Sequence, residues 1–203
     1  SDVYKRQAYN TTEYIKDMGT PGRFQEVQRD VVNGLPSILS YKTAQKALFV
    51  DRDNTLISVD KGDYLLSRSN LRFLDDNIAK VANISKNFNL VCLVTNSPQI
   101  AMGKLTFRSL DELHSMLVQH CITLGLKIDV IALCPHHPHN GFDYEIPSLK
   151  TTCFCRKPSP GMLVEQSFLR NIDLQSSLFI GDTDVDRLAA SSVGCPYLDV
   201  SCL

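Results

Sequence analysis

The segment Lys46-Ala-Leu-Phe-Val-Asp-Arg-Asp-Asn-Thr55 decides the fold that we predict for this chain. Residues 47–50 form a short, continuous apolar run, the pattern of a strand buried on both faces of a sheet. Asp51 and Asp53 follow at once. Because ligands bind beyond the carboxyl ends of parallel strands, both carboxylates are expected where the chemistry occurs. One can attack as a nucleophile while the other moves protons, and a hard cation can hold the site together.

Apolar runs and helical periodicities alternate along the rest of the chain. Strands are expected at residues 46–50, 89–95, 128–133, 177–180 and 196–200. Helices are expected at residues 71–87, 106–124, 161–169 and 185–192. This alternation predicts an α/β fold with three layers, Rossmann-like, built around a mostly parallel sheet. The segment 134–157 has no clear periodicity, so something other than regular secondary structure must fix its conformation.

Length and charge limit the possible functions. The chain has 203 residues, enough for one full domain and an appendage. A formal net charge of -1 gives no reason to expect nucleic acid or an anionic membrane as a partner. The sequence contains no apolar run long enough for a membrane span and no signal-peptide pattern at its start. We expect a cytoplasmic protein.

Polar clusters follow the strands in an informative order. After Asp51 and Asp53, the second strand ends at Thr95-Asn96-Ser97, and Arg156-Lys157 closes the irregular segment. The fourth strand leads into Gly181-Asp-Thr-Asp-Val-Asp186. Acidic side chains can hold a magnesium ion that neutralises phosphate charge. Lysine and backbone N–H groups can hold phosphate oxygens, so the order predicts magnesium-dependent phosphoryl transfer.

The same order of motifs resembles the haloacid dehalogenase superfamily of phosphohydrolases over residues 44–203. The resemblance implies that Asp51 is the nucleophile that forms an aspartyl-phosphate. Asp53 would be the general acid for the leaving alcohol and then the base for the hydrolytic water. Thr95 would bind the phosphoryl group, and Lys157 would stabilise charge on the phosphate and the nucleophile. A lone Asp-x-Asp-x-Thr would be a weak signal, because a polar loop that caps a strand has the same pattern.

The resemblance also implies a magnesium site. Asp182 would bind Mg²⁺ together with Asp51 and the backbone carbonyl of Asp53. Asp186 would support Asp182 without being a ligand. The expected phosphate- and substrate-binding residues are Thr95, Asn96, Ser97, Arg156, Lys157 and Asp60.

A second set of residues has the spacing of a metal site. Cys-x-His and Cys-x-Cys pairs flank one loop, and four such ligands suit tetrahedral zinc. The expected zinc ligands are Cys134, His136, Cys153 and Cys155. A site with four protein ligands is structural, and a metal can replace a hydrophobic core in ordering the loop. His137 and His139 are alternatives to His136, and scattered loop histidines with core cysteines are the plainer interpretation.

Zinc-ligand spacing followed by Arg156-Lys157-Pro is similar to the heptose bisphosphate phosphatases and the related histidinol phosphatases. The segment Val94–Gly103 is similar to their V-T-N-Q-x-G-I-A-R-G motif, but Gln99 replaces the glycine and Met102 the arginine. These departures put the fine specificity in doubt. Both groups lack a large cap domain. Access is then expected to depend on the Asp60–Tyr64 loop, the zinc loop and the Asn96–Lys104 segment.

The N-terminal part has a different character. Glu13–Phe24 contains Asp-Met-Gly-Thr-Pro-Gly-Arg-Phe, which resembles the end of the catalytic domain of sugar-1-phosphate nucleotidyltransferases. A helix is expected from Pro21 to about Asn33, with Thr20 as its N-cap. Residues 1–40 are therefore interpreted as a nucleotidyltransferase remnant plus linker, and residues 41–203 as the phosphatase domain. The alternative is an unrelated helix packed on that domain.

The substrate prediction combines the two resemblances. A nucleotidyltransferase fused to a phosphatase fits activated-heptose synthesis for lipopolysaccharide or S-layers, so removal of the 7-phosphate of D-glycero-D-manno-heptose 1,7-bisphosphate is favoured. Histidinol phosphate is the alternative substrate. A hypothesis of another class is a catalytically silent module that stabilises the fused nucleotidyltransferase.

Overall fold

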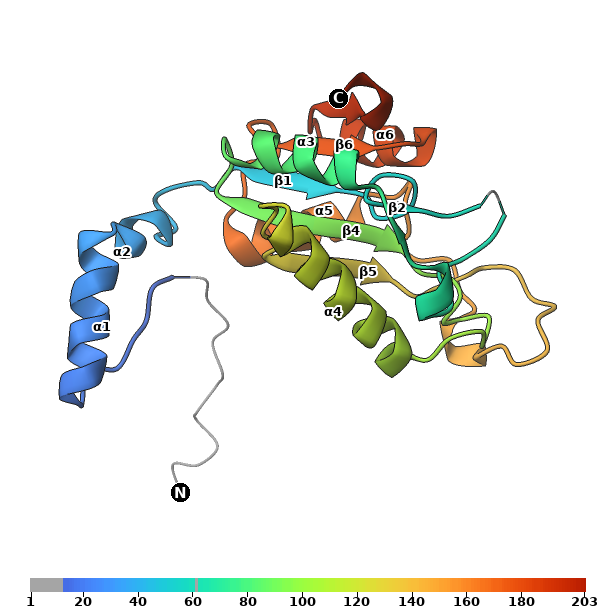
Figure 1. The fold of residues 1–203 in the computed structure, drawn as a ribbon, viewed down its shortest axis with the longest axis horizontal. Coiled ribbons are helices and arrows are strands. Elements are labelled where there is room, and N and C mark those ends of the chain that lie inside the picture. Colours follow the sequence, from blue (N-terminus) through green and yellow to red (C-terminus); the bar gives the residue numbers. More distant parts are fainter. Residues whose placement is uncertain (1–12, 61) are drawn as a thin grey trace.

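Strand β1 (Ala47–Val50) is the central strand of a five-stranded sheet in which every pairing is parallel. The computed structural model describes residues 13–60 and 62–203, so the expectations for residues 1–12 lie outside the described residues. The sheet order is β5-β4-β1-β6-β7 (Figure 1). The other strands are β4 (Leu90–Asn96), β5 (Val130–Cys134), β6 (Leu178–Gly181) and β7 (Tyr197–Asp199).

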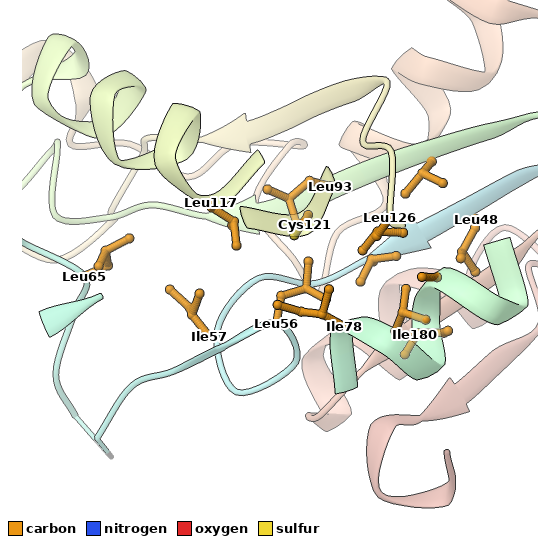
Figure 2. Close-up of a cluster of buried hydrophobic side chains, with 14 of the residues drawn as sticks. Leu48, Leu56, Ile57, Leu65, Ile78, Leu93, Leu117, Cys121, Leu126 and Ile180 are labelled. Atoms are coloured by element: carbon orange, nitrogen blue, oxygen red, sulfur yellow. The ribbon is translucent and has the colours of Figure 1, made fainter. Parts of the chain in front are cut away.

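Two helices cover each face of the sheet, which gives the three predicted layers. Leu48 and Val50 belong to a hydrophobic cluster with α3 (Asp75–Ser85) and α4 (Phe107–Thr123), and Figure 2 shows this cluster. Ala47 and Phe49 belong to a second cluster with α5 (Gly161–Arg170) and α6 (Asp184–Ser191). All four β1 side chains are fully buried. Burying each of the larger ones contributes about 1.5–3 kcal/mol.

The topology places the loop after β1, which contains Asp51 and Asp53, at a favourable position for binding a ligand. From β1 the chain proceeds through β4 to β5 on one side, and then returns to place β6 and β7 on the other side. Such a change of direction opens a crevice beyond the carboxyl ends of the strands. Asp51 follows β1 and Asp182 follows β6, and these two strands are neighbours in the sheet. The predicted α/β architecture is therefore confirmed.

One predicted helix begins later than its periodicity indicated. Helix α3 starts at Asp75, whereas residues 71–87 were expected to be helical. Arg72–Phe73 instead forms strand β3, which pairs antiparallel with β2 (Ile57–Ser58). Phe73 stacks on His120 of α4, with ring centroids 3.8 Å apart. This tertiary contact, together with the hairpin pairing, stabilises the extended form over the helical one.

The segment between β1 and α3 is too short to form a separate domain over the sheet edge. Within its described residues it contains the β2–β3 hairpin and the 3-10 turn Arg68–Asn70. A second long connection, between β5 and α5, contains the 3-10 turn Pro147–Leu149. Among the helices that the structure describes, none is both long enough and apolar enough to cross a membrane.

The N-terminal helix α1 (Pro21–Val32) begins as predicted. The Thr20 hydroxyl accepts a hydrogen bond from the Arg23 amide, and Pro21 occupies the first turn. The helix is followed by the short helix α2 (Leu35–Ile38), and both stand apart from the sheet in Figure 1. Helix α1 has no buried residue in the described chain, and its apolar side chains Phe24, Val31 and Val32 are exposed.

Candidate active site and metal cluster

A cleft of about 200 Å³ lies beyond the carboxyl ends of the central strands. The end of β4 and three connections contribute to it: the loop after β1, the segment before α5, and the turn from β6 into α6. Its lining residues are Asp51, Asp53, Asn54, Asn96, Lys157, Asp182, Thr183, Val185 and Asp186. The structure thus brings the two predicted catalytic aspartates together with Lys157 and Asp182, which are more than 100 residues away in the sequence.

Lys157 is the centre of the buried charge network. Its Nζ lies 2.5 Å from Asp51 Oδ1 and 2.6 Å from Asp186 Oδ1, and it donates to the Val94 carbonyl at 2.9 Å. The side chain is 4% exposed. Burial by itself lowers the pKa of Lys157, but the two carboxylates outweigh it, so the net shift is upward. The ammonium therefore stays charged and next to the predicted nucleophile.

Asp186 was expected to support Asp182, and that role stays a prediction. Its hydrogen-bond and ion-pair contacts in the described residues are with Lys157 and with Thr183. Thr183 donates to Asp186 Oδ2 from its amide at 3.2 Å and from its hydroxyl at 2.7 Å. This capping box begins helix α6. Asp186 is thus fixed by a helix start and in turn holds Lys157 against Asp51.

The acidic side chains in the cleft could hold a cation. One oxygen from each of Asp51, Asp182 and Asp186 lies within 4.8 Å of the others. Burial raises the pKa of Asp51 to about 7, with Lys157 opposing the shift, and raises that of Asp182 to about 6. Three carboxylates share a single ammonium here, so negative charge is left uncompensated. A hard, oxygen-binding divalent cation such as Mg²⁺ fits this donor set.

Asp53 has a partner that the sequence analysis missed. Arg52 donates to both Asp53 carboxylate oxygens, from Nε to Oδ1 at 2.9 Å and from Nη2 to Oδ2 at 2.8 Å. The third nitrogen of Arg52, Nη1, lies 2.9 Å from His114 Nε2 on α4. Strand alternation was an available signal, because Arg52 continues the face of Leu48 and Val50, which points towards α3 and α4.

Thr95 and Asn96 are the last two residues of β4, and Ser97 follows them. Asn96 exchanges two hydrogen bonds with the Lys157 backbone, each 3.0 Å long, and so ties the end of β4 to the lysine. Thr95 and Ser97 are fully buried, and neither is among the lining residues of the cleft in the described chain. Their predicted contacts with phosphate stay predictions.

Two other predicted substrate residues lie outside this cleft. Asp60 lines a separate polar pocket of about 170 Å³, together with Asp63, Tyr64 and Arg72. Arg156 Nη1 donates to the His136 carbonyl at 3.2 Å. The structure therefore does not bring Asp60 or Arg156 to the cleft, and their contacts with substrate also stay predictions.

The four predicted zinc ligands converge on one point. The Sγ atoms of Cys134, Cys153 and Cys155 lie 3.1–3.5 Å apart. His136 Nδ1 lies 3.6 Å from Cys134 Sγ and 3.3 Å from Cys155 Sγ. A tetrahedron built on Zn–S bonds of about 2.3 Å has edges of about 3.8 Å, slightly longer than these distances. All seven cysteines lie in the described chain and none is in a disulfide.

The alternative histidines have other contacts. The rings of His137 and His139 pack edge to face with centroids 5.4 Å apart, and His137 also packs on Phe142. The donor set of three sulfurs and one imidazole nitrogen therefore consists of the predicted residues, and it fits zinc. This cluster could hold a zinc ion through protein ligands alone.

The loop between β5 and α5, which carries the Cys/His cluster, packs directly on the segment after β4. The Ser97 amide donates to the Cys134 carbonyl at 2.7 Å, and the Ile146 amide donates to the Ala101 carbonyl at 2.9 Å. Gly103 has φ +69°, and a Cβ there would lie 1.7 Å from the Tyr144 carbonyl oxygen. Only glycine fits this approach without a shift of the backbone. The loop is therefore shaped by backbone contacts as well as by the cluster.

The sequence of this chain is similar to those of several proteins that carry the same name. The chain is 34% identical over 151 residues to the D-glycero-β-D-manno-heptose-1,7-bisphosphate 7-phosphatase of Vibrio cholerae, covering 74% of this chain and 78% of that protein. It is also 34% identical over 154 residues to the enzyme of that name from Yersinia pestis, covering 75% and 79%. No protein-family model matches the chain.

Comparison with solved structures agrees with the sequence comparison. A HAD-like protein from Mesorhizobium loti superposes with a TM-score of 0.66 at 28% identity, over 75% of this chain and 70% of that one. The D,D-heptose 1,7-bisphosphate phosphatase from B. bronchiseptica, complexed with magnesium and phosphate, superposes with a TM-score of 0.63 at 27% identity, over 75% and 78%.

Proposed function

We propose a substrate and a mechanism for this chain, which belongs to the family of the D-glycero-β-D-manno-heptose-1,7-bisphosphate 7-phosphatases, in the haloacid dehalogenase superfamily, and is a phosphatase. We propose that it removes the 7-phosphate of D-glycero-D-manno-heptose 1,7-bisphosphate in a magnesium-dependent reaction. The observation that carries this proposal is the cleft in which Lys157 bridges Asp51 and Asp186 beside Asp182.

In the proposed reaction, Asp51 and Asp53 share the work. An Asp51 oxygen forms a bond to phosphorus as the bond to the sugar oxygen breaks, and Asp53 gives its proton to that oxygen. Water then attacks phosphorus and gives a proton to Asp53, and the bond between Asp51 and phosphorus breaks. Lys157 keeps positive charge next to Asp51 in both steps. Magnesium held by Asp51, Asp182 and the Asp53 carbonyl would supply positive charge to the phosphate oxygens.

Two features support the remaining parts of the proposal. The magnesium in the B. bronchiseptica complex supports a magnesium site here. The convergence of Cys134, His136, Cys153 and Cys155 supports structural zinc. Zinc binding needs thiolates, and a reducing compartment keeps cysteines free for it, so we place the protein in the cytoplasm.

The substrate assignment is tested by phosphate release from purified protein with magnesium. Heptose 1,7-bisphosphate, supplied as each anomer, is compared with histidinol phosphate. We expect kcat/KM for at least one heptose anomer to exceed that for histidinol phosphate by about tenfold or more, a difference of about 1.4 kcal/mol. A higher kcat/KM for histidinol phosphate would show that histidinol phosphate, and not the heptose bisphosphate, is the substrate. No turnover of any sugar phosphate would instead favour the catalytically silent module.

We also propose that residues 1–40 are the remnant of a fused nucleotidyltransferase with its linker. The exposed apolar side chains Phe24, Val31 and Val32 of α1 support this, because a helix with such a face is usually covered by another element. The natural polypeptide, isolated from its source and weighed by mass spectrometry, should be long enough to include a nucleotidyltransferase domain. A natural chain without such a domain contradicts this part of the proposal.

A further inference from the structure

Arg52 is a charged side chain almost without contact to solvent. It is 1% exposed and is the largest of the fully buried side chains. Arginine is almost never fully buried unless it is paired. Its described partners are Asp53, which accepts from two of its nitrogens, and His114, which faces the third. The three residues form a row from the core face of α4 to the cleft.

His114 must be the acceptor in this row. A guanidinium has five N–H donors and no acceptor, so the 2.9 Å contact requires a lone pair on His114 Nε2. The imidazole is then neutral, with its proton on Nδ1. Burial, together with the neighbouring charge of Arg52, lowers the pKa of His114 to about 3. His114 therefore gives Arg52 a fixed hydrogen-bond partner without adding charge.

The two parallel hydrogen bonds fix the plane of the Asp53 carboxylate. A bidentate pair of this kind sets orientation more strictly than a single contact, and a lysine cannot reproduce it. Each carboxylate oxygen has two lone pairs, and Arg52 occupies one on each. A site for a proton therefore remains on each oxygen. The Asp53 side chain is 31% exposed and lines the cleft, so that site is accessible to substrate.

We propose that Arg52, held by His114, is a positioning residue that fixes Asp53 for proton transfer in both steps of the reaction. The inference rests on the proposed function, in which Asp53 first protonates the leaving sugar oxygen and then takes a proton from water. It assigns no contact between Arg52 and the substrate. Loss of the bidentate contact should therefore impair steps that need a proton and spare a step that does not.

Two substrates, one whose leaving group needs a proton and one whose leaving group does not, distinguish these two kinds of step. p-Nitrophenolate leaves without a proton, whereas the sugar alkoxide needs one. In rapid-mix experiments, Arg52→Lys should slow the first release of sugar alcohol from heptose 1,7-bisphosphate by about 10–100-fold. The first burst of p-nitrophenol from p-nitrophenyl phosphate should change by less than about threefold. Steady-state turnover of p-nitrophenyl phosphate should fall, because dephosphorylation still needs Asp53 as the base.

Variants of His114 test the same chain of contacts without changing the loop after β1. They also keep the proposal testable if Arg52→Lys does not fold. His114→Leu removes the acceptor and should give the same selective loss, about 3–10-fold. His114→Gln offers an amide oxygen in its place and should restore most of the rate. His120→Leu is the matched control: His120 is also on α4 but stacks on Phe73, so both first-turnover rates should match wild type.

Two other outcomes have distinct meanings. Equal loss with both substrates, or no loss with either, overturns the positioning role of Arg52 while leaving the proposed function intact. A wild-type protein that turns over neither phosphate overturns the proposed function and the inference with it.

Discussion

Asp51→Asn is expected to abolish phosphatase turnover, with kcat falling by about 10⁴-fold or more. The amide has the shape of the carboxylate but cannot form the bond to phosphorus. The fold should survive, because Asp51 is 7% exposed and a neutral side chain is easier to bury than a charged one. Lys157 also keeps its second carboxylate partner, Asp186. Phosphate release from heptose 1,7-bisphosphate measures the effect.

Two further measurements make this test specific. The zinc content and thermal midpoint of Asp51→Asn should match wild type, which separates loss of chemistry from loss of structure. Asp184→Asn is the matched control, because Asp184 is a highly exposed acid near the cleft that pairs with Arg187 on the surface. Its activity should be within about twofold of wild type. Activity within about tenfold of wild type in Asp51→Asn contradicts the assignment of the nucleophile.

The parts of this molecule that the sequence predicted well are governed by local signals. Strand β1 is recognisable because an uninterrupted apolar run is what a strand with both faces covered requires. Helix α4 was expected at residues 106–124 and spans Phe107–Thr123, and the Thr106 hydroxyl caps its start by accepting from the Ser109 amide. The clustering of Asp51 with Asp182 follows from topology, because both stand at carboxyl ends of neighbouring parallel strands.

The parts that were missed depend on contacts between distant residues. Phe73 fits a helical spacing, but its stacking on His120 holds it in a strand. The pairing of Asp186 with Lys157 was also not predicted, because nothing in the spacing of the two residues indicates that the ammonium is within reach. His114 has the spacing of a core residue on α4, and the sequence does not say that Arg52 comes from another element to meet it.

Cys153→Ser is expected to remove zinc and to lower thermal stability together. The loop between β5 and α5 has little regular structure, so the cluster of Cys134, His136, Cys153 and Cys155 takes the place of a core there. We expect the free energy of unfolding to fall by roughly 2–5 kcal/mol. For a chain of this size, that lowers the thermal midpoint by roughly 5–15 °C. Elemental analysis and thermal unfolding measure the two effects.

The same variant should also affect catalysis, because Arg156 and Lys157 directly follow Cys155. A looser loop would let the Lys157 ammonium move from Asp51, so kcat should fall more than KM rises. Cys202→Ser is the control: this exposed thiol lies far along the chain from the cluster, and its loss should change neither zinc content nor the midpoint. Wild-type protein without zinc, or Cys153→Ser with full zinc and an unchanged midpoint, contradicts the site. A zinc chelator used with excess magnesium should reproduce the variant in wild type and have no further effect on Cys153→Ser, which ties the stability loss to the metal.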